Sequence, residues 1–262
     1  THRGNFVNFV NSIRTGGGTP THRMFSQADA YMRRPLTANS PWAKDPGNTA
    51  APYLGCRRNY HIVMTDGRWN GTPFTGGARD NALSQALPDG QVYGGATVAA
   101  RAQTNLYRDT ATNTLADWAF NSWANPLQTS GLTGSLTPST AYTSAAATES
   151  FGVDSTGAPA VLDKYWNPKY DPATWPHMVT YTIGFSQMAN TWPGAPTIAA
   201  PTAQVPFGYD GSFPDFVTAN RTWPDMVVGG EAVRSLDLWH AALNGRGRFY
   251  AVTRGQDLER AF

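Results

Sequence analysis

The sequence feature that most constrains the fold of this chain is a short apolar run, residues 60–65, which leads into Asp66 and Gly67. An apolar run of this length that stops at turn residues predicts a buried β-strand. In open α/β sheets, ligands bind beside the carboxyl ends of the strands, which is where Asp66 would lie. We therefore expect Asp66 at the ligand-binding edge of a sheet.

A second candidate ligand residue lies upstream, on a glycine-rich loop. Three glycines at 16–18 precede Thr19, and a helical pattern follows over residues 20–32 with Pro20 in its first turn. Thr19 is expected either to cap that helix or to offer its hydroxyl as a ligand. Hydroxyl and carboxylate oxygens suit hard cations such as Mg²⁺ or Ca²⁺, so Thr19 and Asp66 together predict a divalent-cation site.

Further strands and helices alternate along the chain. Residues 177–185 are rich in β-branched and aromatic side chains, which predicts a strand in the interior of a sheet, and residues 248–253 predict a third strand. Helical patterns cover residues 5–13, 20–32, 115–125, 236–243 and 256–262. This alternation predicts an α/β fold with a mostly parallel sheet and helices on both faces.

Two long insertions are expected within a single domain that spans residues 1–262. The first, 125–165, is rich in Ser, Thr, Ala and Gly over residues 129–160, so we expect it to bury little surface and to be mobile. The second, 190–230, carries aromatic side chains that either bind a ligand or fold the insertion onto its own sheet. These side chains are Trp192, Phe207, Tyr209, Phe213, Phe216 and Trp223.

Composition excludes several classes of partner. A formal net charge of +2, with 15% charged residues, is too small to indicate a nucleic-acid partner. No apolar run approaches the roughly 18 residues that a membrane-spanning helix needs, so no membrane insertion is expected. The single Cys56 is expected to be a small buried side chain or half of a bridge to another segment. Because Thr1 opens directly on an amphipathic segment, we expect a fragment of a longer or processed chain.

Several sequence blocks, taken together, resemble the von Willebrand factor type A-like domain of PilY-type proteins of the type IV pilus tip. The blocks are residues 17–20, 56–70 with its Thr-Asp-Gly-x-Trp-Asn core, 107–109, 114–117, 171–180 and 237–247. The resemblance implies an extracellular, Rossmann-like bacterial module that is not an enzyme. It also implies roles in pilus assembly, surface sensing and adhesion, with minor pilins and host or abiotic surfaces as partners.

Many von Willebrand type A domains hold a cation in a metal-ion-dependent adhesion site built from three loops. The resemblance implies that Thr19 belongs to the second loop and Asp66 to the third. The first loop, Asp-x-Ser-x-Ser, does not occur in this sequence, and the strand that would carry it would precede Thr1. We therefore expect an incomplete site unless the missing part of the protein or another chain supplies the first loop.

Two alternatives to adhesion remain open. The chain could be a structural, pilus-priming module that docks minor pilins without any host ligand. It could instead be a serine hydrolase, because Ser186 follows a predicted strand and Asp225 and His240 come later in the order that such triads use. Met188 stands where a nucleophile elbow needs a small residue, and the apolar surroundings of His240 favour a core histidine.

Overall fold

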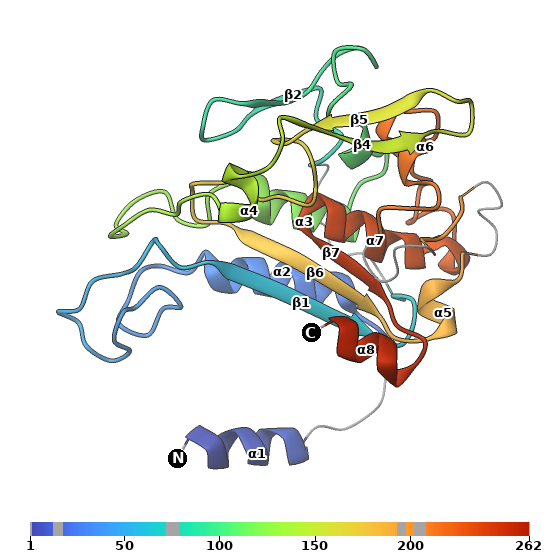
Figure 1. Ribbon diagram of the computed structural model, residues 1–262. Coiled ribbons are helices and arrows are strands. Elements are labelled where there is room, and N and C mark those ends of the chain that lie inside the picture. The colour runs from blue at the N-terminus through green and yellow to red at the C-terminus, as the bar shows by residue number, and fades with distance from the viewer. Residues whose placement is uncertain (1, 13–17, 72–78, 193–197, 202–207, 262) are drawn as a thin grey trace.

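A three-stranded parallel sheet forms the centre of the protein within the described residues. The computed structural model describes residues 2–12, 18–71, 79–192, 198–201 and 208–261. The strand order is β1–β6–β7, with bounds Asn59–Thr65, Met178–Gly184 and Arg246–Ala251 (Figure 1). The predicted parallel α/β arrangement is confirmed, and it is compatible with a Rossmann-like fold.

Helices and two hairpins surround this sheet. The helices are α1 (His2–Ser12), α2 (Thr21–Met32), α3 (Leu115–Ala124), α4 (Thr140–Thr143), α5 (Gln187–Asn190), α6 (Phe213–Val217), α7 (Ser235–Asn244) and α8 (Gly255–Ala261), with the short 3-10 turns η1 (Asn105–Tyr107) and η2 (Glu231–Val233). The antiparallel hairpins pair β2 (Ser84–Ala86) with β3 (Val92–Gly94) and β4 (Thr148–Val153) with β5 (Pro159–Asp163).

One face of the sheet carries the main hydrophobic core. Helices α2, α3 and α7 lie over this face (Figure 1), and Trp123, Trp239 and Phe249 belong to the main core and are almost completely buried. The start of α3 is fixed by a capping box, in which Thr114 and Asp117 each bond the backbone of the other. Full burial of an apolar side chain of this size contributes about 1.5–3 kcal/mol, so this layer supplies much of the stability.

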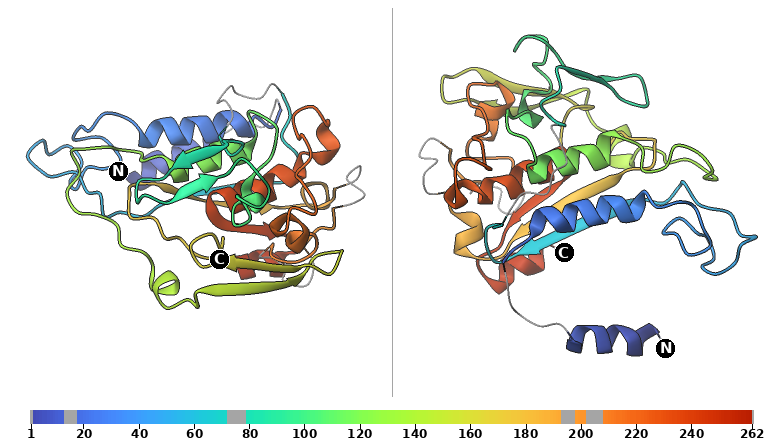
Figure 2. Two further views of the ribbon diagram at one scale, coloured as in Figure 1. Left: turned by 90° about the horizontal axis from the view of Figure 1, so that it is seen from above. Right: turned by 180° about the vertical axis from the view of Figure 1, so that it is seen from behind.

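The other face of the sheet is only partly covered. Helix α8 lies on the side opposite α3 and α7, and its Leu258 packs against a small cluster of Ile183, Tyr250 and Val252 (Figure 1 and Figure 2). The β1 side chains that share this face are Tyr60, Ile62 and Met64, which are 55%, 55% and 56% exposed. The prediction of a fully buried strand covered on both faces is therefore wrong for β1, because no helix in the described ranges covers its second face.

The first insertion contains more regular structure than its composition predicts. Residues 148–163 form the β4–β5 hairpin, and alternate residues of β5 point into the core, so Ala160 and Leu162 are completely buried. The prediction that residues 129–160 bury little surface is wrong over this hairpin, and their mobility stays a prediction. Buried and exposed residues alternate along β5, which is the pattern of a half-buried strand. The strand is only five residues long, so small and polar residues around it dominate the local composition.

The aromatic side chains of the second insertion are core residues in the structure. Trp192, Tyr209, Phe213, Phe216 and Trp223 are at most 7% exposed. Phe216 stacks on Trp223 with ring centroids 3.8 Å apart, and Trp192 stacks on Trp239 of α7 at 5.3 Å. Phe207 lies outside the described residues. These contacts agree with the alternative in which the insertion folds onto its own sheet. The rings are buried, so they have no exposed face for an external ligand.

Cys56 differs from one of the two expectations for its position. The side chain is exposed and has no disulfide partner among the described residues, and a bridge to another segment stays a prediction. The prediction of a small buried side chain is wrong, because Cys56 lies in the turn just before β1 and not within it.

Candidate functional site

The carboxyl ends of β1 and β6 meet at one rim of the sheet, and Asp66 lies there. The Asp66 residue is exposed, while its backbone carbonyl accepts a 2.5 Å hydrogen bond from the Ser186 hydroxyl. The backbone amide of Phe185 donates to the Thr65 carbonyl at 2.8 Å. The loops that leave β1 and β6 are thus tied together at the rim.

The loop that carries Thr19 is held against the loop that follows β1. The Thr19 amide donates to Asn70 Oδ1 at 2.7 Å, and the Asn70 amide donates to the Thr19 carbonyl at 3.2 Å. A Cβ at Gly18 would lie 2.1 Å from Asn70 Oδ1, so the approach requires glycine there. The structure therefore joins the two loops that carry Thr19 and Asp66 through Asn70, four residues after Asp66.

Thr19 does not cap α2. The helix begins at Thr21 with Pro20 as its N-cap residue, and no side-chain hydrogen bond caps it. The Thr19 carbonyl accepts the Thr21 amide at 2.9 Å. One hydroxyl and one carboxylate supply too few oxygens for a hard cation, which takes about six, so further ligands would have to come from water and from another segment. The metal role of Thr19 and Asp66 stays a prediction.

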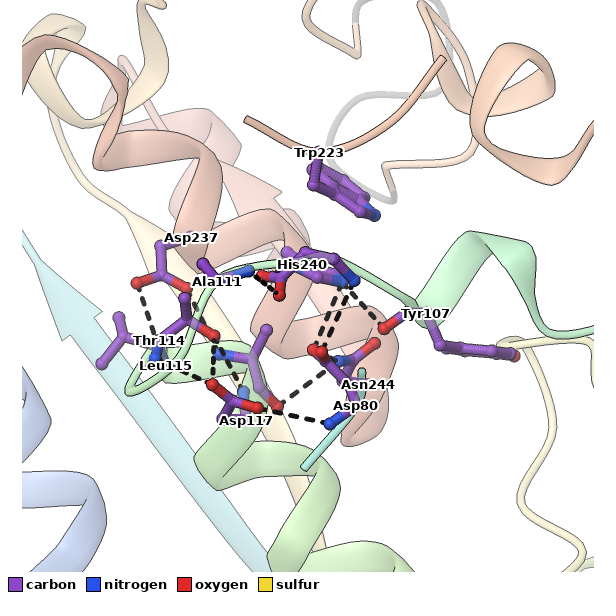
Figure 3. A network of polar contacts seen from close by, with 12 residues as sticks. Asp80, Tyr107, Ala111, Thr114, Leu115, Asp117, Trp223, Asp237, His240 and Asn244 are labelled. Carbon is purple, nitrogen blue, oxygen red and sulfur yellow. Dashed lines mark hydrogen bonds and ion pairs between the residues drawn. The ribbon is translucent and has the colours of Figure 1, made fainter. Parts of the chain in front are cut away.

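A hydrogen bond connects the rim loop to the core. Trp69, between Asp66 and Asn70, is buried, and its Nε1 donates to Asp237 Oδ2 of α7 at 2.9 Å. The same carboxylate accepts the backbone amides of Leu115 and Ala116 at 3.0 and 3.2 Å (Figure 3). Because these amides form the N-terminus of α3, the helix dipole also favours a negative charge at this position.

Asp237 belongs to a network of buried polar side chains where α3 and α7 pack together (Figure 3). We define this buried carboxylate network as Asp80, Asp109, Asp117, Asp237, His240 and Asn244. His240 Nε2 lies 3.1 Å from the Tyr107 carbonyl oxygen and 3.8 Å from Asp80 Oδ2, and its Nδ1 lies 3.6 Å from Asp109 Oδ2. Asn244 Nδ2 donates to Asp80 Oδ2 at 2.7 Å.

Burial sets the protonation of this network. Desolvation, reinforced by neighbouring carboxylates, raises the pKa of Asp109 to about 8 and that of Asp80 well above its usual range. Desolvation also raises the pKa of Asp237 to about 7 and lowers that of His240 to about 3. At neutral pH the imidazole is therefore neutral, and the carboxyl groups around it retain protons.

The same residues are a poor metal centre. One ligand atom each from Asp80, Asp109 and His240 fits within 4.8 Å, and all three residues are buried. However, opposite nitrogens of the ring face the two carboxylates, and one ion can use only one of these nitrogens. The Nε2 proton also already has an acceptor in the Tyr107 carbonyl. The arrangement is better explained by a neutral imidazole beside protonated acids, whose oxygens lie 3.6 and 3.8 Å from its nitrogens, beyond hydrogen-bond distance.

The three residues of the hydrolase alternative, Ser186, Asp225 and His240, each form hydrogen bonds with other groups and not with one another. The Ser186 hydroxyl also accepts the Ala189 amide at 3.2 Å, as the N-cap of α5. Asp225 Oδ1 accepts the amides of Val227 and Val228, both at 2.9 Å. His240 is completely buried and stacks on Trp223, which confirms the expectation of a core histidine. These contacts give the triad no support.

No helix in the described part of the chain is both long and apolar enough to cross a bilayer.

The chain is similar over its whole length to curated proteins of the type IV pilus. It is 34% identical over 265 residues to the type IV pilus biogenesis factor PilY1 of Pseudomonas aeruginosa strain PAK, and 33% identical over 262 residues to PilY1 of strain UCBPP-PA14. These matches cover 100% of this chain but only 20% and 19% of the relatives. No protein-family profile and no solved structure matches the chain. The resemblance to PilY-type proteins is therefore confirmed along the whole sequence, and the chain carries a PilY-type segment that spans about one-fifth of the length of its relatives.

Proposed function

We propose that this segment is a binding module of a type IV pilus protein, and that it acts in pilus biogenesis or at the pilus tip. The support is the similarity to PilY1 along the entire chain. We further propose an extracellular location, adhesion to a host or abiotic surface, and a non-enzymatic role. Binding would use the loops at the rim of the sheet.

One observation supports the rim as the binding surface: Asn70 joins the Thr19 loop to the loop that begins at Asp66. Two oxygen-bearing side chains are thereby presented on neighbouring loops beside the carboxyl ends of the strands. In open α/β sheets, such ends are the usual ligand position. A Mg²⁺ or Ca²⁺ ion held by Thr19 and Asp66 would be completed by another part of the protein or by another chain.

The test is the Asp66→Ala substitution in the full-length protein, with attachment of piliated cells to a surface measured in Mg²⁺ or Ca²⁺ and after chelation. We expect the substitution to lower divalent-dependent attachment and to leave the thermal midpoint unchanged, because Asp66 is exposed. Asp163→Ala is a matched control, since Asp163 is also exposed but lies at the end of β5. Equal metal-dependent attachment of the Asp66 variant and the control would reject the rim site.

The same experiment separates adhesion from the alternative of pilus priming. If Asp66→Ala cells keep normal numbers of pili and lose attachment, the rim binds an external ligand. If they lose the pili themselves, the rim instead docks pilus subunits such as minor pilins during assembly.

A further inference from the structure

A small cavity beside η1 is lined by three arginines that come from two distant parts of the chain. Its volume is about 120 Å³, and Arg101, Arg108 and Arg221 all contribute to its wall. A space of this size accommodates several water molecules. That room suits one carboxylate or phosphate group and excludes a drug-sized ligand.

The three guanidinium groups have spare hydrogen-bond donors. Among the described residues, none of the three forms an ion pair within 4.0 Å. Arg101 Nη1 donates to the Gly95 carbonyl at 3.4 Å, and Arg108 Nη1 donates to the carbonyls of Asn81 and Ala82. Arg221 Nε is buried without a hydrogen-bond partner. Each guanidinium has five N–H donors, so the wall retains unused positive donors.

The acids near the cavity neutralise only part of this charge. Asp109 also lines the cavity, but burial raises its pKa to about 8, so it is mainly protonated at neutral pH. Although burial acts in the opposite direction, hydrogen bonds from Ser155 and Asn220 and the charge of Arg221 lower the pKa of Asp215, so this carboxylate is ionised and offsets one of the three arginines. A net positive charge therefore remains at the cavity.

The cavity wall also contains a strained residue. Ala219 has a φ of 61°, in the left-handed region that residues with a side chain rarely adopt. Such a conformation is unfavourable for a residue with a side chain and persists only where the surrounding structure imposes it. The turn that places Arg221 at the cavity is thus held in position at an energetic cost.

A larger cavity, with several aliphatic side chains in its wall, adjoins the arginines. Its volume is about 310 Å³, it shares Val98 and Asn105 with the smaller cavity, and Pro159, Val161 and Val217 line it. A ligand that filled both cavities would place an anionic group among the arginines and an apolar group against the β5 and α6 side chains. We propose that Arg101, Arg108 and Arg221 form a binding site for a carboxylate that carries an apolar tail.

The site is tested by calorimetric titration of hexanoate, acetate and inorganic phosphate into the full-length protein. We expect hexanoate to bind more tightly than acetate, because only hexanoate reaches the larger cavity. Arg221→Gln and Arg101→Gln should each weaken hexanoate binding about tenfold or more, which is the usual effect of losing a charged hydrogen bond. Arg23→Gln, on an exposed position of α2, is the control and should bind like the unchanged protein.

A second variant tests the tail separately from the charge. Val161→Ser should reduce hexanoate binding to the level of acetate while leaving acetate binding unchanged. Because Val161 is 38% exposed, the fold should tolerate the change. Hexanoate binding that is the same in Arg221→Gln and Arg23→Gln, or no binding of any probe, would overturn the site. Phosphate that binds more tightly than hexanoate would overturn the apolar tail and leave a site for an inorganic anion.

Discussion

The indole N–H of Trp69 donates to the buried carboxylate of Asp237 at 2.9 Å, and this bond links the rim loop to helix α7. Trp69 belongs to the same short loop as Asp66 and Asn70. Asp237 also accepts the first two amides of α3, so one carboxylate holds the rim loop, α3 and α7 together. The position of the proposed binding loops therefore depends on a residue that no external ligand can reach.

Replacing Asp237 should destabilise the protein and loosen the rim. Asp237→Ala leaves two buried amides and one indole N–H without an acceptor, which we expect to cost about 3 kcal/mol or more in the free energy of unfolding. Asp237→Asn keeps one acceptor oxygen and should cost less. Urea denaturation of both variants measures the difference. A loss below about 0.5 kcal/mol in Asp237→Ala, the range of ordinary surface substitutions, would contradict this role.

The buried acids should make the protein less stable as the pH rises above neutrality. In the folded state the pKa values of Asp109 and Asp237 are raised to about 8 and about 7, whereas in the unfolded chain both groups ionise near pH 4. Between about pH 6.5 and 8.5 the folded state holds more protons than the unfolded state, so the free energy of unfolding falls as the pH rises. We expect a fall on the order of 1–2 kcal/mol across this window.

Asp109→Asn isolates the contribution of Asp109 to that slope. The buried histidines are the same in both proteins, so their opposite contribution to the slope cancels in this comparison. Urea denaturation at several pH values should show a shallower slope for Asp109→Asn than for the unchanged protein. An identical slope in the two proteins would mean that Asp109 is already ionised in the folded state.

The sequence predicted the sheet because its strands differ in pattern from everything around them. Residues 178–184 combine β-branched and aromatic side chains on both faces, and the structure buries both faces. The same reasoning failed for β1, since its composition is equally apolar but Tyr60, Ile62 and Met64 are exposed. Composition measures which side chains could be buried, and only the tertiary arrangement decides which face of β1 is covered.

The buried carboxylate network could not be predicted from the sequence, for a different reason. Asp80, Asp109 and His240 are separated by 29 to 160 positions along the chain, and no spacing rule relates them. The capping box of Thr114 and Asp117 was predictable because both partners lie within one turn of α3. For the other members of the network, the local sequence offered one indication, which is that Asp237 is a charged residue within an otherwise apolar helical pattern.

Gly18 should be more sensitive to substitution than Gly67, although both lie in the rim loops. A Cβ at Gly18 would collide with Asn70 Oδ1, whereas a Cβ at Gly67 would meet no atom within 4 Å. We expect Gly18→Ala to displace Asn70, to cost about 1–3 kcal/mol and to lower the proposed metal-dependent attachment. Gly67→Ala is the matched control. Equal stability and attachment of the two variants would show that the Thr19 loop and Asn70 are not in contact in solution.

Two neighbouring residues of β1 test whether the second face of the sheet is open. Val63 is 1% exposed and points into the main core, while Ile62 is 55% exposed on the other face. We expect Val63→Ala to cost about 2 kcal/mol in the free energy of unfolding, because it leaves a cavity in a packed layer. Ile62→Ala removes a larger part of a side chain but should cost less than about 1 kcal/mol, because that part is already in water. Urea denaturation of the two variants measures both values. A greater cost for Ile62→Ala would show that a segment outside the described residues covers β1 in solution.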